Sequence, residues 1–389
     1  MRVLYINSVI DFGSTGRIVR DLANAQTESL VCFGRKTGRS EDYRMTALPG
    51  NIEGALAAIL FDRNGFANRK ETRRLVALIR EYDPDIIHLH NLHGYYLNIE
   101  TLFDFLKQYK KPVVWTLHDC WSYTGYCPYY DAAGCEKWKT GCKACPYPFA
   151  YPFSLFKQHT SENYERKKQI FNGVGKLTIV TPSVWLKNEV QHSFLSAYPV
   201  RVIPNGIDLK NFNPEGRKKN GTFSILFAAS YWTREKGSEE IQKLLPLLNK
   251  DIRVVIIGQG SEAFKNAPNV TALPRTSSQA ELAGHYRNAD LFVNLTLQDN
   301  FPTVNIEALN CGTPVITYAT GGSPEIADEK TGAVVPKGDY KAMAELINRL
   351  STENPFLAAE CEARGKRFSV ANMAAAYASL YKELYTISD

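Results

Sequence analysis

The segment of residues 85–119, DIIHLHNLHGYYLNIETLFDFLKQYKKPVVWTLHD, indicates how this chain folds. It begins with the apolar run DIIHLHN and ends with PVVWTLHD, and a helical pattern lies between the two runs. Short runs rich in β-branched residues that alternate with helices are typical of parallel strands joined by crossover helices. The segment therefore predicts one strand–helix–strand unit of an α/β fold.

The same alternation extends on both sides of this segment. Further runs of this kind predict strands at 3–7, 177–183, 223–230, 253–260, 289–296 and 313–319. The pattern is interrupted once, at 202–221, by VIPNGIDLKNFNPEGRKKNG, whose Pro, Gly, Asn and charged residues are typical of a linker. Because 389 residues exceed what one core usually organises, we expect two doubly wound α/β domains in series.

The predicted domains have definite boundaries. The first covers 1–208 and carries a cysteine-rich insertion at 120–146, the second covers 209–368, and a helix at 369–389 packs back on the first domain. In open α/β sheets, ligands bind beyond the carboxyl ends of the strands, so two such domains would face a central cleft. The last helix is amphipathic, with Tyr377, Leu380, Tyr381 and Leu384 near one face.

Composition and charge exclude several classes of protein. The hydrophobic fraction is 44%, the net charge is only +6, and the opening run MRVLYINSV is too short for a signal peptide. No segment offers about 18 uninterrupted apolar residues, so we expect a cytoplasmic protein. Two basic clusters are either solvated helix faces or sites of attraction to an anionic membrane. They are Arg63, Arg69, Lys70, Arg73 and Arg74, and Arg166, Lys167 and Lys168.

The stretch 299–325, DNFPTVNIEALNCGTPVITYATGGSPE, closely resembles the nucleotide-sugar site of family 4 retaining glycosyltransferases of the GT-B fold. Five further motifs of that family follow the family order and cover nearly the whole chain: FGSTGR at 12–17, His118-Asp119, PNGID at 204–208, TREKG at 233–237 and GQG at 258–260. The resemblance implies that the first domain binds the acceptor and the second binds a UDP- or GDP-sugar donor.

The family signature is a pair of carboxylates separated by seven residues, here Asp299 and Glu307. The resemblance implies that Glu307 binds the ribose hydroxyls of the donor, since an ionised carboxylate offers only acceptors. Asp299, where the family usually has Glu, would lie beside the transferred sugar. The segment from Asn300 and Phe301 through Thr303 and Val304 should enter a helix whose first N–H groups face the diphosphate, so no catalytic metal is expected.

The other motifs add candidate residues by the same resemblance. Lys236 and, less well aligned, Arg234 match the basic pair that holds the donor phosphates. His118 matches the histidine that meets the donor sugar, and Asp119 would orient it or act on the acceptor. The turn after the first strand supplies three further candidates for the phosphate and acceptor region, Gly13, Ser14 and Gly16, unless it is a simple strand-to-helix turn.

Five of the eight cysteines lie within 26 residues, at 120, 127, 135, 142 and 145. The spacing leaves three states open for Cys127, Cys135, Cys142 and Cys145: a structural Cys₄ zinc site, free thiols or disulfides. Some family 4 enzymes of bacterial polysaccharide pathways look similar here. The aromatic residues among the cysteines either stack on acceptor sugars or pack in the core. They are Trp121, Tyr123, Tyr126, Tyr129 and Tyr130.

The resemblance thus implies a retaining transferase that moves a hexose-type sugar to a glycan or a polyprenyl-diphosphate-linked saccharide in capsule or exopolysaccharide assembly. Two alternatives remain open, a nucleotide-sugar epimerase and a non-catalytic binding subunit. No nucleic-acid partner is expected. Peripheral contact with the cytoplasmic membrane face stays open.

Overall fold

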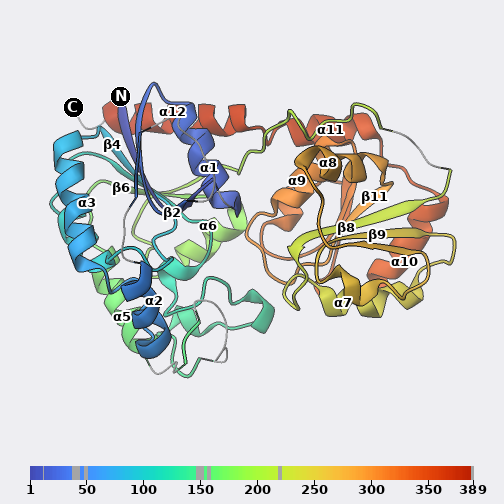
Figure 1. Cartoon of the computed structure of the whole chain (residues 1–389), viewed down its shortest axis with the longest axis horizontal. Helices are drawn as coiled ribbons and strands as arrows, with labels where there is room; N and C mark the ends of the chain where they lie inside the picture. The colour runs from blue at the N-terminus through green and yellow to red at the C-terminus, as the bar shows by residue number, and fades with distance from the viewer. Residues whose placement is uncertain are drawn as a thin grey trace. The chain divides into compact units, whose positions relative to one another are not determined.

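The structure, a computed structural model, describes residues 1–11, 13–36, 44–47, 51–145, 153–155, 159–217 and 221–386. The chain divides into two compact units (Figure 1). Unit 1 contains Met1–Pro204 and Met373–Asp389, and unit 2 contains Asn205–Asn372. The sequence predicts the domain boundary after residue 208, and the structure places it after Pro204. Pro146 and residues 387–389, which end two of the predicted segments, lie outside the described residues.

Unit 1 is built on a seven-stranded sheet with the order β3-β2-β1-β4-β5-β6-β7, in which all neighbouring strands are parallel. Its elements are β1 (Arg2–Ile10), α1 (Gly13–Asn24), β2 (Glu28–Lys36), β3 (Arg44–Ala47), α2 (Asn51–Phe61), α3 (Arg69–Tyr82), β4 (Ile86–Leu89), α4 (Ile99–Leu106), β5 (Val113–Thr116), α5 (Thr160–Phe171), β6 (Leu177–Thr181), α6 (Val184–Gln191), β7 (Val200–Val202) and most of α12 (Val370–Thr386). Three short 3₁₀ turns lie between β5 and α5: η1 (Trp121–Tyr123), η2 (Asp131–Ala133) and η3 (Lys137–Lys139).

Helices cover both faces of this sheet. On one face α3, α4, α5 and α6 pack against alternate strand residues such as Leu4 and Ile6. On the other face α1 and α12 pack against the intervening residues, such as Val3 and Tyr5. Strands that are buried on both faces favour apolar residues at nearly every position, which is why β1, β4 and β5 read as largely apolar runs.

Side-chain caps fix where several helices begin. Asn98 accepts a hydrogen bond from the N–H of Thr101 at the start of α4, and Ser183 accepts one from Leu186 at the start of α6. These bonds satisfy N–H groups that have no partner inside the helix. Both helices therefore start directly beyond the turns that follow β4 and β6.

Unit 2 contains a six-stranded sheet with the order β10-β9-β8-β11-β12-β13, also parallel. Its core lies in two layers, with α8, α9 and α11 on one face and α7 and α10 on the other. Its elements are β8 (Ser224–Tyr231), α7 (Ser238–Leu244), η4 (Leu245–Leu247), β9 (Arg253–Gln259), η5 (Ser261–Phe264), β10 (Val270–Leu273), α8 (Gln279–Asn288), β11 (Leu291–Asn294), α9 (Thr303–Asn310), β12 (Val315–Tyr318), η6 (Ser323–Glu325), β13 (Gly332–Val335), α10 (Tyr340–Thr352) and α11 (Ala358–Lys366).

The predicted class, two doubly wound α/β domains, is confirmed. Each of the eight predicted strands corresponds to an observed one, whereas five strands were not predicted: β2, β3, β7, β10 and β13. Four of these, β3, β7, β10 and β13, have only three or four residues, and all four lie at the edge of a sheet. Such strands need no continuous apolar run, so they leave a weaker signal in the sequence.

Helix α12 is tied to the sheet of unit 1 by buried tyrosines. Tyr381 and His88 Nδ1 are hydrogen-bonded at 2.6 Å, and Tyr377 and Thr116 at 2.8 Å. Met373 and Leu380 are buried beside them, while Leu384 is partly buried. None of the helices in the described part of the chain has the length and apolar character needed to cross a bilayer.

Candidate functional site

The sheet of unit 1 has a point where the strand order reverses. β1 pairs with β2 on one side and with β4 on the other, so the chain changes direction of winding between β1 and β4. Ligands of open α/β sheets bind beyond the carboxyl ends of the strands at such a point. Helix α1 begins there with Gly13, whose φ of +64° suits glycine, and Gly13 and Ser14 are exposed. Gly16 is buried against Asp11, where a Cβ would lie 3.2 Å from the backbone nitrogen.

Two histidines meet at the carboxyl ends of β4 and β5. His90 Nδ1 lies 2.9 Å from His118 Nε2, and the two rings are stacked. Burial lowers the pKa of His118 to about 4, and it lowers the pKa of His90 well below the ordinary value. Both rings are therefore neutral at physiological pH, and His118 can contact an uncharged ligand such as a sugar.

Asp119 is hydrogen-bonded to a third histidine beside these rings. Its Oδ2 lies 2.7 Å from His93 Nε2, and its Oδ1 accepts a hydrogen bond from the N–H of Trp121. Burial raises the pKa of Asp119, but His93, the Trp121 N–H and His118 together outweigh burial and place it below the usual range. The carboxylate is thus ionised although its side chain is only 11% exposed. These four residues, His90, His93, His118 and Asp119, line one small cavity.

Unit 2 has the equivalent reversal between β8 and β11. Lys236 follows β8 and Asp299 follows β11, and Lys236 Nζ lies 2.7 Å from Asp299 Oδ2. The structure therefore brings together two predicted site residues that are 63 positions apart. Arg234 is not part of this pair. Its side chain is 75% exposed and lies 3.8 Å from Glu239.

The segment after Asp299 leads directly into α9. Pro302 is its N-cap, and no side chain caps this helix start, so the N–H groups of Thr303 and Val304 are left to other partners, whereas that of Asn305 donates to the carbonyl oxygen of Pro302. Thr303 and Val304 are partly exposed there. The ring of Phe301 instead packs in the core, and Asn300 is buried. The side chain of Phe301 is therefore not available to a ligand.

Glu307 lies one turn further along α9 and is 5% exposed. Tyr286 Oη donates a hydrogen bond of 3.1 Å to Glu307 Oε2. The loop that carries Asp299 is fixed from behind by Gly321, because a Cβ at Gly321 would lie 1.7 Å from the carbonyl oxygen of Asp299. Only glycine permits this approach. Asp299 thus lies just before the first residue of α9, and Glu307 lies one turn inside the same helix.

Comparison with known proteins decides the family. The model described as Glycosyltransferase Family 4 matches residues 15–211, and the one described as Glycosyl transferases group 1 matches residues 222–353. The chain belongs to glycosyltransferase family 4. A relative, the putative colanic acid biosynthesis glycosyl transferase WcaC of Escherichia coli K12, is 30% identical over 304 residues, which cover 74% of this chain and 72% of WcaC.

Other relatives of this glycosyltransferase match over less of their length. A D-inositol 3-phosphate glycosyltransferase of Paenarthrobacter aurescens is 32% identical over 48% of this chain and 52% of its own. Among solved structures, sucrose-phosphate synthase from Thermosynechococcus elongatus covers all of both chains with a TM-score of 0.73 at 18% identity. HepE of Anabaena, solved in complex with UDP, covers 98% of this chain and 100% of its own with a TM-score of 0.67 at 14% identity. Both likenesses show the GT-B fold.

The cysteine-rich insertion of this glycosyltransferase brings four of its cysteines together. Cys127, Cys135, Cys142 and Cys145 line one small cavity together with Trp138 and other aromatic side chains. In the described residues no group of three or more His, Cys, Asp or Glu side chains is placed to hold a metal ion, and none of the eight cysteines forms a disulfide. Zinc binding by these four cysteines stays a prediction. Burial raises the pKa of Cys127 to about 12, which favours the protonated thiol.

The aromatic residues of the insertion are mainly core residues. Four of the five predicted candidates for sugar stacking, Trp121, Tyr123, Tyr126 and Tyr130, are at most 5% exposed. Lys167, predicted as part of a solvated or membrane-facing cluster, is also buried. Its Nζ donates to the carbonyl oxygens of Trp121 and Thr124, and it lies 3.5 Å from the centre of the Trp121 ring. This burial could not be predicted, because a lysine between Arg166 and Lys168 is expected to be exposed.

Two residues of the site were not predicted, His90 and His93. They lie in the turn after β4, and each contacts a predicted site residue of the turn after β5. The sequence did contain a signal for these two histidines, because the carboxyl ends of neighbouring parallel strands lie at the same edge of a sheet. Histidines directly after one strand could therefore have been paired with His118 and Asp119 after the next.

Proposed function

We propose that this family 4 enzyme is a retaining hexosyltransferase that transfers a sugar from a nucleoside diphosphate sugar to a lipid-linked glycan during polysaccharide assembly. The observation that carries the proposal is the Lys236–Asp299 pair, which lies at the strand-order reversal of unit 2 beside the uncapped start of α9. A cation and the N–H groups of a helix start at one point suit a departing diphosphate.

Unit 2 would hold the donor. Lys236 and the first N–H groups of α9 bind the diphosphate, and Glu307, oriented by Tyr286, accepts hydrogen bonds from the ribose. Asp299 lies beside the transferred sugar and stabilises positive charge as it develops at the anomeric carbon. In the free structure Asp299 is paired with Lys236, so donor binding exchanges this ion pair for contacts with the phosphates and the sugar. Arg234 contributes at most long-range attraction.

Unit 1 would supply the acceptor side. His118, kept neutral by burial, contacts the sugar, His90 fixes its ring, and the ionised Asp119 orients the acceptor hydroxyl with His93. Gly13 and Ser14, exposed at the start of α1, stay candidates for contact with the phosphates and the acceptor, whereas Gly16 packs against Asp11. In the reaction the bond from the anomeric carbon to the diphosphate breaks, and the acceptor oxygen bonds that carbon on the same face. The hydroxyl proton passes to the departing diphosphate.

The comparisons support this setting. WcaC is named for colanic acid biosynthesis, and another relative, from Staphylococcus aureus, is named for capsular polysaccharide biosynthesis. HepE has been solved with UDP-glucose. A UDP-hexose is accordingly the first donor to test.

The test is nucleoside diphosphate release from a panel of UDP-, GDP- and ADP-sugars, with and without lipid-linked acceptor. We expect one donor to be turned over, and Glu307→Gln and Lys236→Ala to lower kcat/KM by about 10²-fold or more. Matched controls on the same unit are Glu239→Gln and Lys250→Ala, which should keep wild-type rates. A protein that binds the donor but never turns it over would support a binding subunit, and an epimerised donor sugar would show an isomerase. Either result would overturn the proposal.

A further inference from the structure

Helix α2 has an unusual surface for a helix of a folded protein. Its residues Ile52, Leu56 and Leu60 follow one another at intervals of four, so they lie along one side, and they are 80%, 52% and 42% exposed. Phe61 at the end of the helix is 58% exposed. An exposed apolar stripe of this length marks an interaction site more often than an ordinary surface.

A second segment extends this stripe. The N–H of Leu155 donates a hydrogen bond to the carbonyl oxygen of Ile59, which places Phe153 and Leu155 beside the end of α2. Both side chains are exposed. We call Ile52, Leu56, Leu60, Phe61, Phe153 and Leu155 the α2 ridge. It contains six of the thirteen large hydrophobic side chains that are exposed in the described residues, so the exposed apolar surface is concentrated here.

The opposite side of α2 is fixed to unit 1. Ala58 is fully buried, and a Cβ at Gly54 would lie 2.3 Å from the carbonyl oxygen of Tyr95. Glu53, the single acidic residue of the helix, accepts a hydrogen bond from the N–H of Asn68. The helix therefore cannot turn its apolar side inward, and the ridge stays on the surface.

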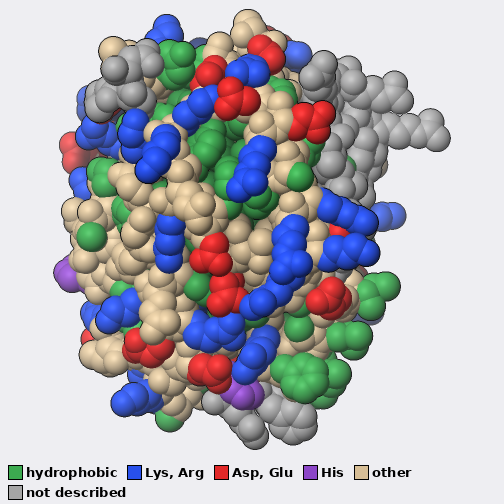
Figure 2. Space-filling view, turned by 90° about the vertical axis from the view of Figure 1, so that its left-hand side faces the viewer, with side chains coloured by type: hydrophobic (Ala, Val, Ile, Leu, Met, Phe, Trp, Pro, Cys, Tyr) green, Lys and Arg blue, Asp and Glu red, His purple; other side chains and the backbone are tan. Residues whose placement is uncertain are grey.

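Basic residues flank the ridge at both ends. Arg63 follows α2, and the contact between Glu53 and Asn68 brings the start of α3 to its first turn. The segment 63–74 contains five basic residues and one acidic residue. Lys70 and Arg73 form no ion pair with any described residue and are exposed. Figure 2 shows the side of the molecule on which α3 lies, with Lys and Arg side chains across it and hydrophobic side chains grouped at its lower right edge.

We propose that the α2 ridge and the basic start of α3 dock unit 1 on an anionic lipid bilayer. Apolar side chains enter the interface between head groups and acyl chains, while lysine and arginine bind the negative surface. A second copy of the chain fits less well, because a symmetric contact would bring the two basic segments against each other. The inference rests on the proposed function, because docking on a bilayer would hold the enzyme beside its lipid-linked acceptor.

The experiment is co-sedimentation of the full chain with vesicles of about three parts phosphatidylethanolamine to one part phosphatidylglycerol, compared with phosphatidylcholine alone. We expect binding to the anionic vesicles that weakens with salt, and at least about tenfold weaker binding for Leu56→Gln/Leu60→Gln and for Lys70→Gln/Arg73→Gln. The control Leu247→Gln/Leu357→Gln replaces two similarly exposed leucines of unit 2 and should bind like wild type.

Three results would overturn the inference: wild type that does not prefer anionic vesicles, ridge variants that bind as well as wild type, or a wild-type dimer that Leu56→Gln/Leu60→Gln dissociates. Nucleoside diphosphate release without vesicles is measured in parallel and should be equal in wild type and the ridge variants. Vesicle binding needs no donor, so it can fail while the transferase proposal stands. Conversely, failure of the transferase proposal leaves vesicle binding intact.

Discussion

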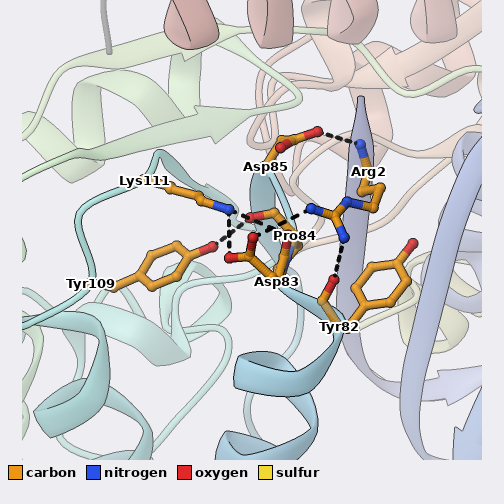
Figure 3. Close-up of polar contacts among 7 residues, drawn as sticks. All are labelled: Arg2, Tyr82, Asp83, Pro84, Asp85, Tyr109 and Lys111. Carbon is orange, nitrogen blue, oxygen red and sulfur yellow. Dashed lines mark hydrogen bonds and ion pairs between the residues drawn. The ribbon is translucent and has the colours of Figure 1, made fainter. Parts of the chain in front are cut away.

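The two edges of the sheet in unit 1 use polar residues in opposite ways. At the amino edge, where β1, β4 and β5 begin, charged groups are paired and open to solvent (Figure 3). Arg2 donates from its side chain to the carbonyl oxygen of Tyr82 and from its backbone N–H to Asp85, and Lys111 Nζ lies 2.6 Å from Asp83 Oδ1. Asp83 also ends α3 in the left-handed conformation. Every group here serves to join the helix end to the strands.

At the carboxyl edge the polar groups are buried instead. His88, His90, His93, His118 and Asp119 are all at most 9% exposed, and His90 Nε2 has no hydrogen-bond partner among the described residues. Burying neutral histidines and an ionised carboxylate costs free energy that apolar residues would not cost. Folding alone does not explain such a choice, so the comparison supports the proposal that the carboxyl edge is the functional edge.

The largest expected effect comes from Asp119→Asn at the carboxyl edge. The substitution keeps the shape and the oxygen that accepts from Trp121 but removes the charge that pairs with His93. We expect kcat/KM for sugar transfer to fall by about 10²-fold, since groups that orient and polarise a reacting hydroxyl contribute at least that much. Steady-state kinetics with saturating donor and varied acceptor measure it.

The matched control is Asp83→Asn, the same chemical change at the amino edge. Asn also tolerates the left-handed conformation at this position, so the variant should fold and keep wild-type kinetics. If Asp119→Asn stays within about threefold of wild type while folded, the carboxyl edge is structural and the acceptor role of Asp119 is withdrawn.

Much of this comparison could be anticipated from the sequence. The runs that became β1, β4, β5 and β6 are apolar at nearly every position because both faces of the sheet are covered, and such runs are visible without a structure. The pairing of Lys236 with Asp299 follows from their common place after neighbouring strands. Family motifs then supplied His118 and Asp119.

The remainder depends on packing in three dimensions. Spacing shows that Cys127 and Cys145 are near in sequence, but it does not show how their sulfur atoms are directed. The sequence predicts an exposed Lys167, and only the structure shows that its side chain is buried against Trp121. The α2 ridge is similar, since NIEGALAAILF reads as a buried helix and only the fixed contact at Gly54 reveals which side faces outward.

The dependence of stability on pH should separate the two edges, with a smaller effect. Burial lowers the pKa of His118 from 6.5 to about 4, so the unfolded chain binds protons more readily than the folded one. Stability is therefore fully present above pH 6.5 and is lost as the pH falls from 6.5 towards 4. The shift corresponds to about 3 kcal/mol for His118 alone. His88 and His90 act in the same direction.

Thermal unfolding of wild type and His118→Gln between pH 7 and 4.5 measures this contribution. The variant should lose less stability over that range than wild type. The amino edge contributes differently, because the hydrogen bond from Lys111 lowers the pKa of Asp83, whose stabilisation is lost only as the pH falls through that lowered value. Equal slopes for wild type and His118→Gln would contradict a buried neutral histidine at the carboxyl edge.

The smallest effect is expected from Lys111→Met at the amino edge. The side chain of Lys111 is 35% exposed and that of Asp83 is 60% exposed, so water already solvates both charges and screens their attraction. Exposed ion pairs of this kind contribute little to stability, so we expect the urea midpoint of unfolding to stay close to that of wild type and transfer kinetics to stay unchanged. A clearly lower urea midpoint would mean that Lys111, Asp83 and Arg2 act as one network that anchors α3 to β1. A loss of activity in the folded variant would mean that the amino edge also affects catalysis. The proposal that the amino edge is structural and the carboxyl edge functional would then be wrong.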